Sequence, residues 1–148
     1  MNKKLLILCL FLLSCGYKPV YQNINIQNLK FSDIILNGNK EINRKIINSL
    51  SIEKDEDINN KNKLYITTSN KIEITSRDSQ GQAVSFRTNI NVNLNIENND
   101  KSKIKNFNKV FDYKNKDNKF ELVEYQNSIK NELVNEIIGE IIIYLNTQ

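Results

Sequence analysis

The sequence lacks histidine and tryptophan, and its 148 residues include only one proline, four glycines and two cysteines. Without histidine there is no imidazole base for a catalytic triad and no histidine-ligated zinc site. Cys9 and Cys15 are too few to hold zinc by themselves. The scarcity of glycine and proline excludes collagen-like chains and disordered chains rich in those residues.

The remaining composition is typical of one globular domain. Apolar residues make up 39% of the chain and charged residues 26%, and six Phe and six Tyr supply large side chains for a core. The net charge is +4, of which Lys3 and Lys4 lie in the first fourteen residues. Such a mild excess does not favour nucleic acid as a partner, because nucleic-acid-binding domains carry strongly basic patches.

We expect no enzymatic activity, no metal and no cofactor. The sequence offers no nucleophile paired with a base at a recognisable spacing, and no glycine-rich phosphate loop. Four acids share one segment and would suit a cation: Glu53, Asp55, Glu56 and Asp57. A solvated charge run is the favoured interpretation, because the segment has no EF-hand-like pattern.

The first residues have the form of an export signal. Lys3 and Lys4 precede the apolar run Leu5–Leu13. This run is too short to cross a membrane, which takes about 20 apolar residues. Cys15 follows directly, and the Leu12-Leu13-Ser14-Cys15 sequence resembles the lipobox of bacterial lipoproteins. The alternative is an ordinary secretory signal followed by a chance cysteine.

The lipobox resemblance predicts three regions. Residues 1–14 form a signal peptide, residues 15–27 a lipidated tether that begins at Cys15, and residues 28–148 a single α+β domain. Each acyl methylene buried in a membrane contributes about 0.8 kcal/mol, so several chains on Cys15 would anchor the protein durably. Gly16 follows the cysteine where retained lipoproteins carry Asp, so the resemblance implies an outer-membrane location, on the periplasmic side.

Hydrophobic periodicity predicts four strands and two helices. Alternating apolar residues mark strands, and apolar residues three or four apart mark helices. The expected order is strand 29–36, helix 39–51, strands 64–76, 83–96 and 104–113, and helix 118–145. On the last strand we expect Phe107, Phe111 and Tyr113 to face the core. A sheet with one apolar face and two amphipathic helices predicts a two-layer α+β sandwich, with the four-stranded sheet mostly antiparallel.

Short connections between the last three strands place two segments that carry cations at one end of the sheet, where only Asp78 and Asp117 oppose them. The turn at 77–82 contributes Arg77, and the loop at 114–119 contributes three lysines, Lys114, Lys116 and Lys119. Arg87 lies a few residues along the middle strand. We call the group of Arg77, Arg87, Lys114, Lys116 and Lys119 the basic tip. Such a tip suits a phosphorylated or carboxylated ligand, although a lysine-rich chain also places lysines in loops without any ligand.

The outer face of strand 83–96 is lined with asparagine. Asn89, Asn91 and Asn93 alternate with apolar residues and therefore share one face of the sheet. This face has two interpretations. It is either a solvated surface in an asparagine-rich chain or a neutral polar surface that docks against another polar wall.

In order along the chain, three segments resemble the family of lipopolysaccharide (LPS) assembly lipoproteins known as LptE. They are Cys15–Tyr21 after the lipobox, the turn Arg77–Ala83 entering an alternating strand, and Phe111–Tyr113 leading into a long C-terminal helix. The resemblance implies a four-stranded sheet with two helices. It also implies that the protein plugs the outer-membrane LPS translocon barrel LptD, helps that barrel to assemble and binds LPS.

The same resemblance assigns roles to individual residues. Arg77 corresponds to the basic residue of the family's turn, and Lys116 or Lys119 to that of the loop before the last helix. The rival expectation is another small outer-membrane lipoprotein, such as a pilotin or barrel-assembly factor, with no affinity for LPS.

Overall fold

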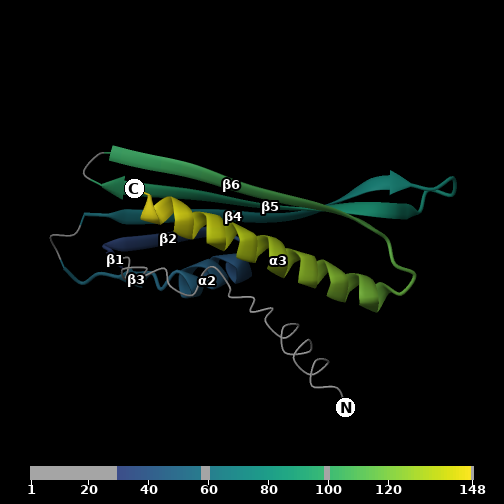
Figure 1. Ribbon diagram of the computed structural model, residues 1–148, viewed down its shortest axis with the longest axis horizontal. Coiled ribbons are helices and arrows are strands. Elements are labelled where there is room, and N and C mark those ends of the chain that lie inside the picture. The colour runs from purple at the N-terminus through teal and green to yellow at the C-terminus, as the bar shows by residue number, and fades with distance from the viewer. Residues whose placement is uncertain (1–29, 58–60, 99–100, 148) are drawn as a thin grey trace, which may run out of the picture.

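The computed structural model describes residues 30–57, 61–98 and 101–147 (Figure 1). Within these ranges the chain forms six strands and two helices. The strands are β1 (Lys30–Phe31), β2 (Asp33–Gly38), β3 (Glu53–Lys54), β4 (Lys63–Arg77), β5 (Ala83–Asn98) and β6 (Lys101–Lys114), and the helices are α2 (Lys40–Ser49) and α3 (Lys119–Asn146). The predicted signal peptide, the tether and Cys15 lie outside the described residues.

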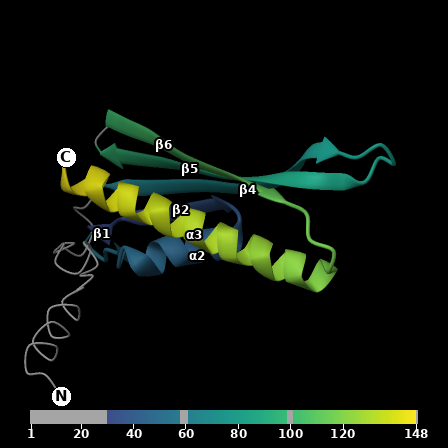
Figure 2. The ribbon, with the colours of Figure 1, turned by 45° about the vertical axis from the view of Figure 1, so that its right-hand side comes forward.

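The main sheet has four strands in the order β2-β4-β5-β6. β2 is parallel to β4, and the other two neighbouring pairs are antiparallel. Both helices lie on the same side of this sheet, as Figures 1 and 2 show from two directions. The α+β two-layer sandwich with a mostly antiparallel sheet is therefore confirmed.

Alternation along β5 explains why the sheet has one buried face. Ile90, Val92 and Leu94 are buried against the helices, while the asparagines between them point to the other side. From α3, Ile137 and Ile141 pack into the same core and are fully buried. Burial of a side chain of this size stabilises the fold by about 1.5–3 kcal/mol relative to exposure.

Asparagine begins each helix. The Asn39 side chain accepts hydrogen bonds from the backbone N–H groups of Glu41 and Ile42, both at 3.1 Å. Asn118 does the same for Phe120 at 2.9 Å and more weakly for Glu121 at 3.5 Å. These bonds satisfy amide groups that a helix leaves unpaired at its start.

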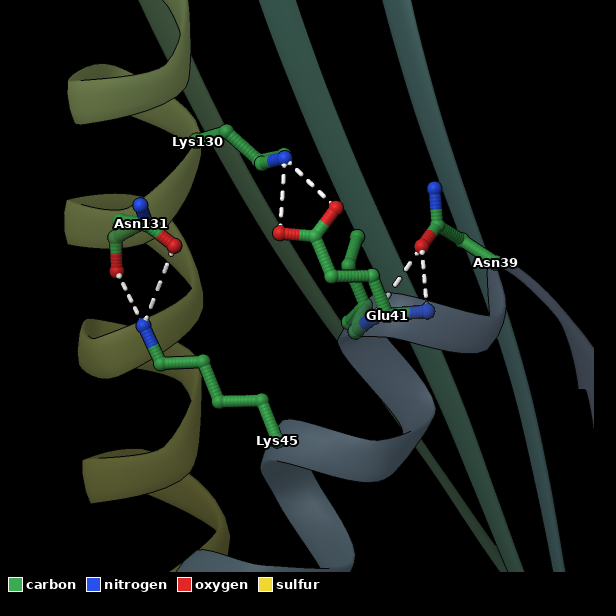
Figure 3. A network of polar contacts seen from close by, with 6 residues as sticks. Asn39, Glu41, Lys45, Lys130 and Asn131 are labelled. Atoms are coloured by element: carbon green, nitrogen blue, oxygen red, sulfur yellow. Dashed lines mark hydrogen bonds and ion pairs between the residues drawn. The ribbon is translucent and has the colours of Figure 1, made fainter.

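Polar contacts join the two helices on their outer side (Figure 3). Lys130 of α3 contacts both carboxylate oxygens of Glu41, at 2.8 and 3.0 Å. Lys45 of α2 donates to the backbone and side-chain oxygens of Asn131, at 3.3 Å each. The pairs fix the two helices relative to each other beneath the sheet.

Gly38 lets the chain leave β2 and enter α2 within two residues. Its φ of +87° is rarely adopted by other residues, and a Cβ there would lie 1.8 Å from the carbonyl oxygen of Thr68. Asn39 then donates its backbone N–H to that same oxygen at 3.2 Å. The close approach ends the pairing of β2 with β4 at Gly38 and Thr68, although β4 itself continues to Arg77.

Two expectations about local structure were wrong. The strand expected at 29–36 is interrupted at Ser32, which donates to the carbonyl of Asn62 and separates β1 from β2. The segment 53–63, where no strand was expected between the helix 39–51 and the strand 64–76, contains β3, which pairs in parallel with β1. Phe107, Phe111 and Tyr113 all face the helices as expected, although Phe111, on the edge strand β6, is 43% exposed.

Candidate ligand-binding tip and polar sheet face

The hairpin formed by β4 and β5 projects beyond the rest of the sheet (Figures 1 and 2). Its turn is closed by Asp78, whose backbone N–H donates to the carbonyl of Gln82 at 2.9 Å. The Asp78 carboxylate also accepts hydrogen bonds from the amides of Gln80 and Gln82, at 2.9 and 2.8 Å. Both the backbone and the side chain of Asp78 therefore stabilise the turn.

Arg77 ends β4 beside this turn. Its guanidinium donates one hydrogen bond to the carbonyl of Gly81 at 2.7 Å and remains exposed. Within the described part of the chain, Arg77 makes no ion pair with a carboxylate. A guanidinium in this position keeps further N–H groups for an anionic ligand.

Asn115 connects the second basic segment to the hairpin. Its backbone donates to the carbonyl of Val84 at 2.7 Å, and its side chain donates to the carbonyl of Ala83 at 2.8 Å. Ala83 is also the partner of Arg77 in the sheet. Arg77 and Asn115 therefore flank the same residue of β5, with backbones about 10 Å apart, which is two strand spacings.

A row of aromatic rings holds Lys116 beside that junction. Phe86 stacks on Tyr113 at 5.7 Å between ring centres, and Tyr125 of α3 meets Tyr113 edge-on at the same distance. The Lys116 ammonium lies 4.8 Å from the centre of the Tyr125 ring, within cation–π range. Lys119 is exposed and begins α3 at the far end of the loop.

Arg87 differs from the other predicted cations of the tip. It lies on the sheet face opposite the helices, where Asp112 of β6 binds its guanidinium through two hydrogen bonds. These bonds hold the pKa of Asp112 below its usual value and raise the pKa of Arg87. A ligand at Arg87 would have to compete with this carboxylate.

The asparagines of β5 form the centre of a broad polar face. Asn89, Asn91 and Asn93 are half-buried between side chains of the two neighbouring strands. Asn91 is paired with Ser69 and Asn108, and Asn93 with Thr67 and Asn106. Asn108 donates to the Asn89 side chain at 2.7 Å, which links β5 and β6 across this face.

The structure adds residues that the sequence had not singled out. Asn106 and Asn108 extend the polar face across β6, and their alternation with Lys105, Phe107 and Lys109 was the available signal. Asn115 had no signal, because its role depends on which carbonyls of β5 lie within its reach. None of the described helices is long and apolar enough to cross a membrane.

The geometry defines an α+β domain with a projecting hairpin that carries Arg77 and a polar sheet face that neither described helix covers. Two solved bacterial lipoproteins share this fold. Rare lipoprotein B from Shewanella oneidensis is 14% identical with a TM-score of 0.59, and the match covers 78% of this chain and 94% of that one. An uncharacterized lipoprotein B from Nitrosomonas europaea is 12% identical with a TM-score of 0.56, over 86% and 88%. No family model and no curated protein matches the sequence.

Proposed function

We propose that the protein is an outer-membrane lipoprotein that plugs the LPS translocon barrel, helps that barrel to assemble and binds LPS on its way to the cell surface. In this proposal the protein is a binding and assembly factor and carries out no catalysis. Cys15 carries the lipid anchor, and the domain faces the periplasm. The partners are the barrel subunit LptD, LPS and the membrane around the anchor.

The observation that carries the proposal is the junction of Arg77, Asn115 and Ala83. It brings the hairpin turn and the loop before α3 together through hydrogen bonds rather than through sequence proximity. In this proposal Arg77 of the turn and Lys116 of the loop, which lie on either side of β5, contact LPS together. The LPS phosphates are bidentate acceptors of the kind that a guanidinium binds well.

The polar face supplies the surface for the barrel in this proposal. The lumen of a large outer-membrane barrel is polar, so a plug must present polar groups to it. Asn89, Asn91 and Asn93 lie at the centre of the face that neither described helix covers. Amide side chains both donate and accept hydrogen bonds, which suits contact with a wall of mixed polarity.

A second function is favoured by the contacts that cations of the basic tip already make within this chain. Lys116 lies over Tyr125, Arg77 donates to Gly81 and Arg87 is bound by Asp112. These contacts are sufficient structural reasons for three basic residues. On this alternative the protein is another small outer-membrane lipoprotein, pilotin-like or a barrel-assembly accessory factor, without LPS binding.

A pull-down from outer membranes in mild detergent tests the plug. The lipidated, tagged chain is expected to recover one large barrel in equal amount, identified by mass spectrometry. Asn89→Asp with Asn93→Asp should reduce that recovery, because it places charge where neutral amides face the lumen. Asn127→Asp with Asn135→Asp adds the same two charges at exposed positions of α3 and serves as the control. Recovery of a secretin or of no partner would contradict the plug.

A further inference from the structure

The outer half of β4 has an unpaired edge. β2 pairs with Lys63–Thr68 and ends there, whereas β4 remains paired with β5 as far as Arg77. From Ser69 to Ser76, no described strand lies on the other side of β4. Backbone N–H and C=O groups along such an edge are a template for an added strand.

Side chains on this segment are also left incompletely covered. Ile72 and Ile74 point to the side of the sheet that carries the helices, yet each is 43% exposed. Asn70 lies just beyond the end of β2, and its side-chain oxygen is buried without a hydrogen-bond partner among the described residues. An added strand would cover the isoleucines and bring polar groups close to Asn70.

The sequence around Ile72 is complementary to itself. Lys71 and Glu73 flank Ile72 and share the opposite face of the sheet, where they form an ion pair with each other. If two copies of β4 run antiparallel about a two-fold axis at Ile72, each residue keeps its own face of the sheet. Ile72 then lies opposite Ile72, and each Lys71 lies opposite the partner's Glu73.

We propose that two copies of this chain associate edge to edge through β4, with residues 69–75 of each copy forming an antiparallel ladder centred on Ile72. The two four-stranded sheets become one continuous sheet. The ladder ends at Thr75. The next residue, Ser76, would have to pair with Thr68 of the other copy, and that Thr68 is already paired with Gly38 of its own chain. The proposal goes beyond the function proposed above and does not depend on LPS or on the barrel.

The charges of Lys71 and Glu73 indicate whether this edge pairs with a second copy or is kept from pairing with any chain. Lysine on an edge strand usually discourages pairing with other chains. Here each lysine of one copy meets a glutamate of the other, so the same charges favour this one register. A register shifted by two residues would place Glu73 opposite Glu73 and is disfavoured.

Charge-reversal variants of the full chain in detergent test the ladder by sedimentation velocity. The unsubstituted chain is expected to dimerise as its concentration rises. Lys71→Glu and Glu73→Lys each place like charges opposite one another twice, and each should weaken the dimer about tenfold or more. The double variant Lys71→Glu/Glu73→Lys should restore it.

Mixing the two single variants separates association from any effect on folding. The acidic and basic edges are complementary to each other, so a 1:1 mixture should form heterodimers while each variant alone stays largely monomeric. A chain that remains monomeric throughout a roughly hundredfold concentration range would overturn the proposal. So would single variants that mix without forming heterodimers.

Disulfide crosslinking tests the register. Ile72→Cys places two thiols directly opposite, where paired Cα atoms are about 4.5–5.5 Å apart and within reach of a disulfide. Ile74→Cys is the matched control, because it has the same exposure but faces Asn70 of the other copy. In that control the two introduced thiols would be about 13 Å apart and too distant to bridge.

The oxidised unsubstituted chain shows any background from Cys9 and Cys15. Ile72→Cys should therefore crosslink well above both Ile74→Cys and this background. Equal crosslinking of the two variants would contradict the register. Crosslinking of Ile72→Cys in membranes to a different protein, with no homodimer, would overturn the proposal and assign the edge to a strand of that protein instead.

Discussion

Arg87 and Asp112 face each other across β5 and β6 and form a two-point ion pair, with Nε at 2.7 Å from one carboxylate oxygen and the terminal nitrogen at 2.8 Å from the other. The pair ties the edge strand to the centre of the sheet near the base of the projecting hairpin. It also takes Arg87 out of the set of cations that are open to a ligand.

This pair predicts a pH-dependent contribution to stability. Hydrogen bonds from Arg87 hold the pKa of Asp112 below its usual 3.8. The contribution is therefore present above that value and is lost as the pH falls through the lower pKa of the folded state. Asp112→Asn should be slightly less stable than the unsubstituted chain at neutral pH, and the difference should vanish at pH about 2. Urea unfolding at both pH values measures this, and a difference that grows in acid would contradict it.

Two glycines with positive φ provide a matched comparison. Gly38→Ala should lower the free energy of unfolding by about 3 kcal/mol or more, because the new Cβ would overlap the carbonyl of Thr68. Gly81→Ala has a φ of +81° but open space around it, so only the backbone cost of about 1–2 kcal/mol applies. Thermal and urea unfolding of the two variants test the difference. Equal losses would mean that the approach of Gly38 to β4 is not needed for the fold.

The Glu41–Lys130 pair predicts coupling between the helices. The Lys130 side chain is 14% exposed, but Glu41 is 66% exposed, so solvent screens the pair and its contribution should not exceed about 1 kcal/mol. A double-mutant cycle with Glu41→Gln and Lys130→Met should give a coupling of about 0.5–1 kcal/mol that falls as salt is added. Lys71→Gln with Glu41→Gln provides a distant control pair, for which we expect no coupling.

The contrast between Phe107 and Phe111 illustrates what the pattern predicts and what it misses. Alternation places both rings on the helix side, where Phe107 is buried against Tyr144 of α3 but Phe111 is 43% exposed. Periodicity predicts the face of a side chain but does not say which side chains of the helix come to lie against it. β1 and β3 could not be predicted because each has only two residues, and an alternation of period two cannot be recognised over so short a segment.

The candidate site divides in a similar way. The end of the sheet that carries Arg77 and Lys116 follows from strand direction alone, and hairpins of known length fix that direction. The pairing of Arg87 with Asp112 depends on register, and the role of Asn115 depends on distances between backbone atoms. Neither is contained in residue spacing. Whether LPS uses the tip remains a prediction.

LPS binding by the tip is tested most directly with purified lipidated protein and LPS, by comparing affinity for three chains. Arg77→Glu/Lys116→Glu reverses the two cations on either side of β5. Arg44→Glu/Lys101→Glu makes the same change in net charge at exposed positions on α2 and at the opposite end of the sheet.

We expect the tip variant to lose at least tenfold in affinity, because each charge-assisted hydrogen bond contributes about 1.5–3 kcal/mol. The control should bind like the unsubstituted chain. Equal affinity of all three chains, or equal loss in both variants, would contradict an LPS site at the tip.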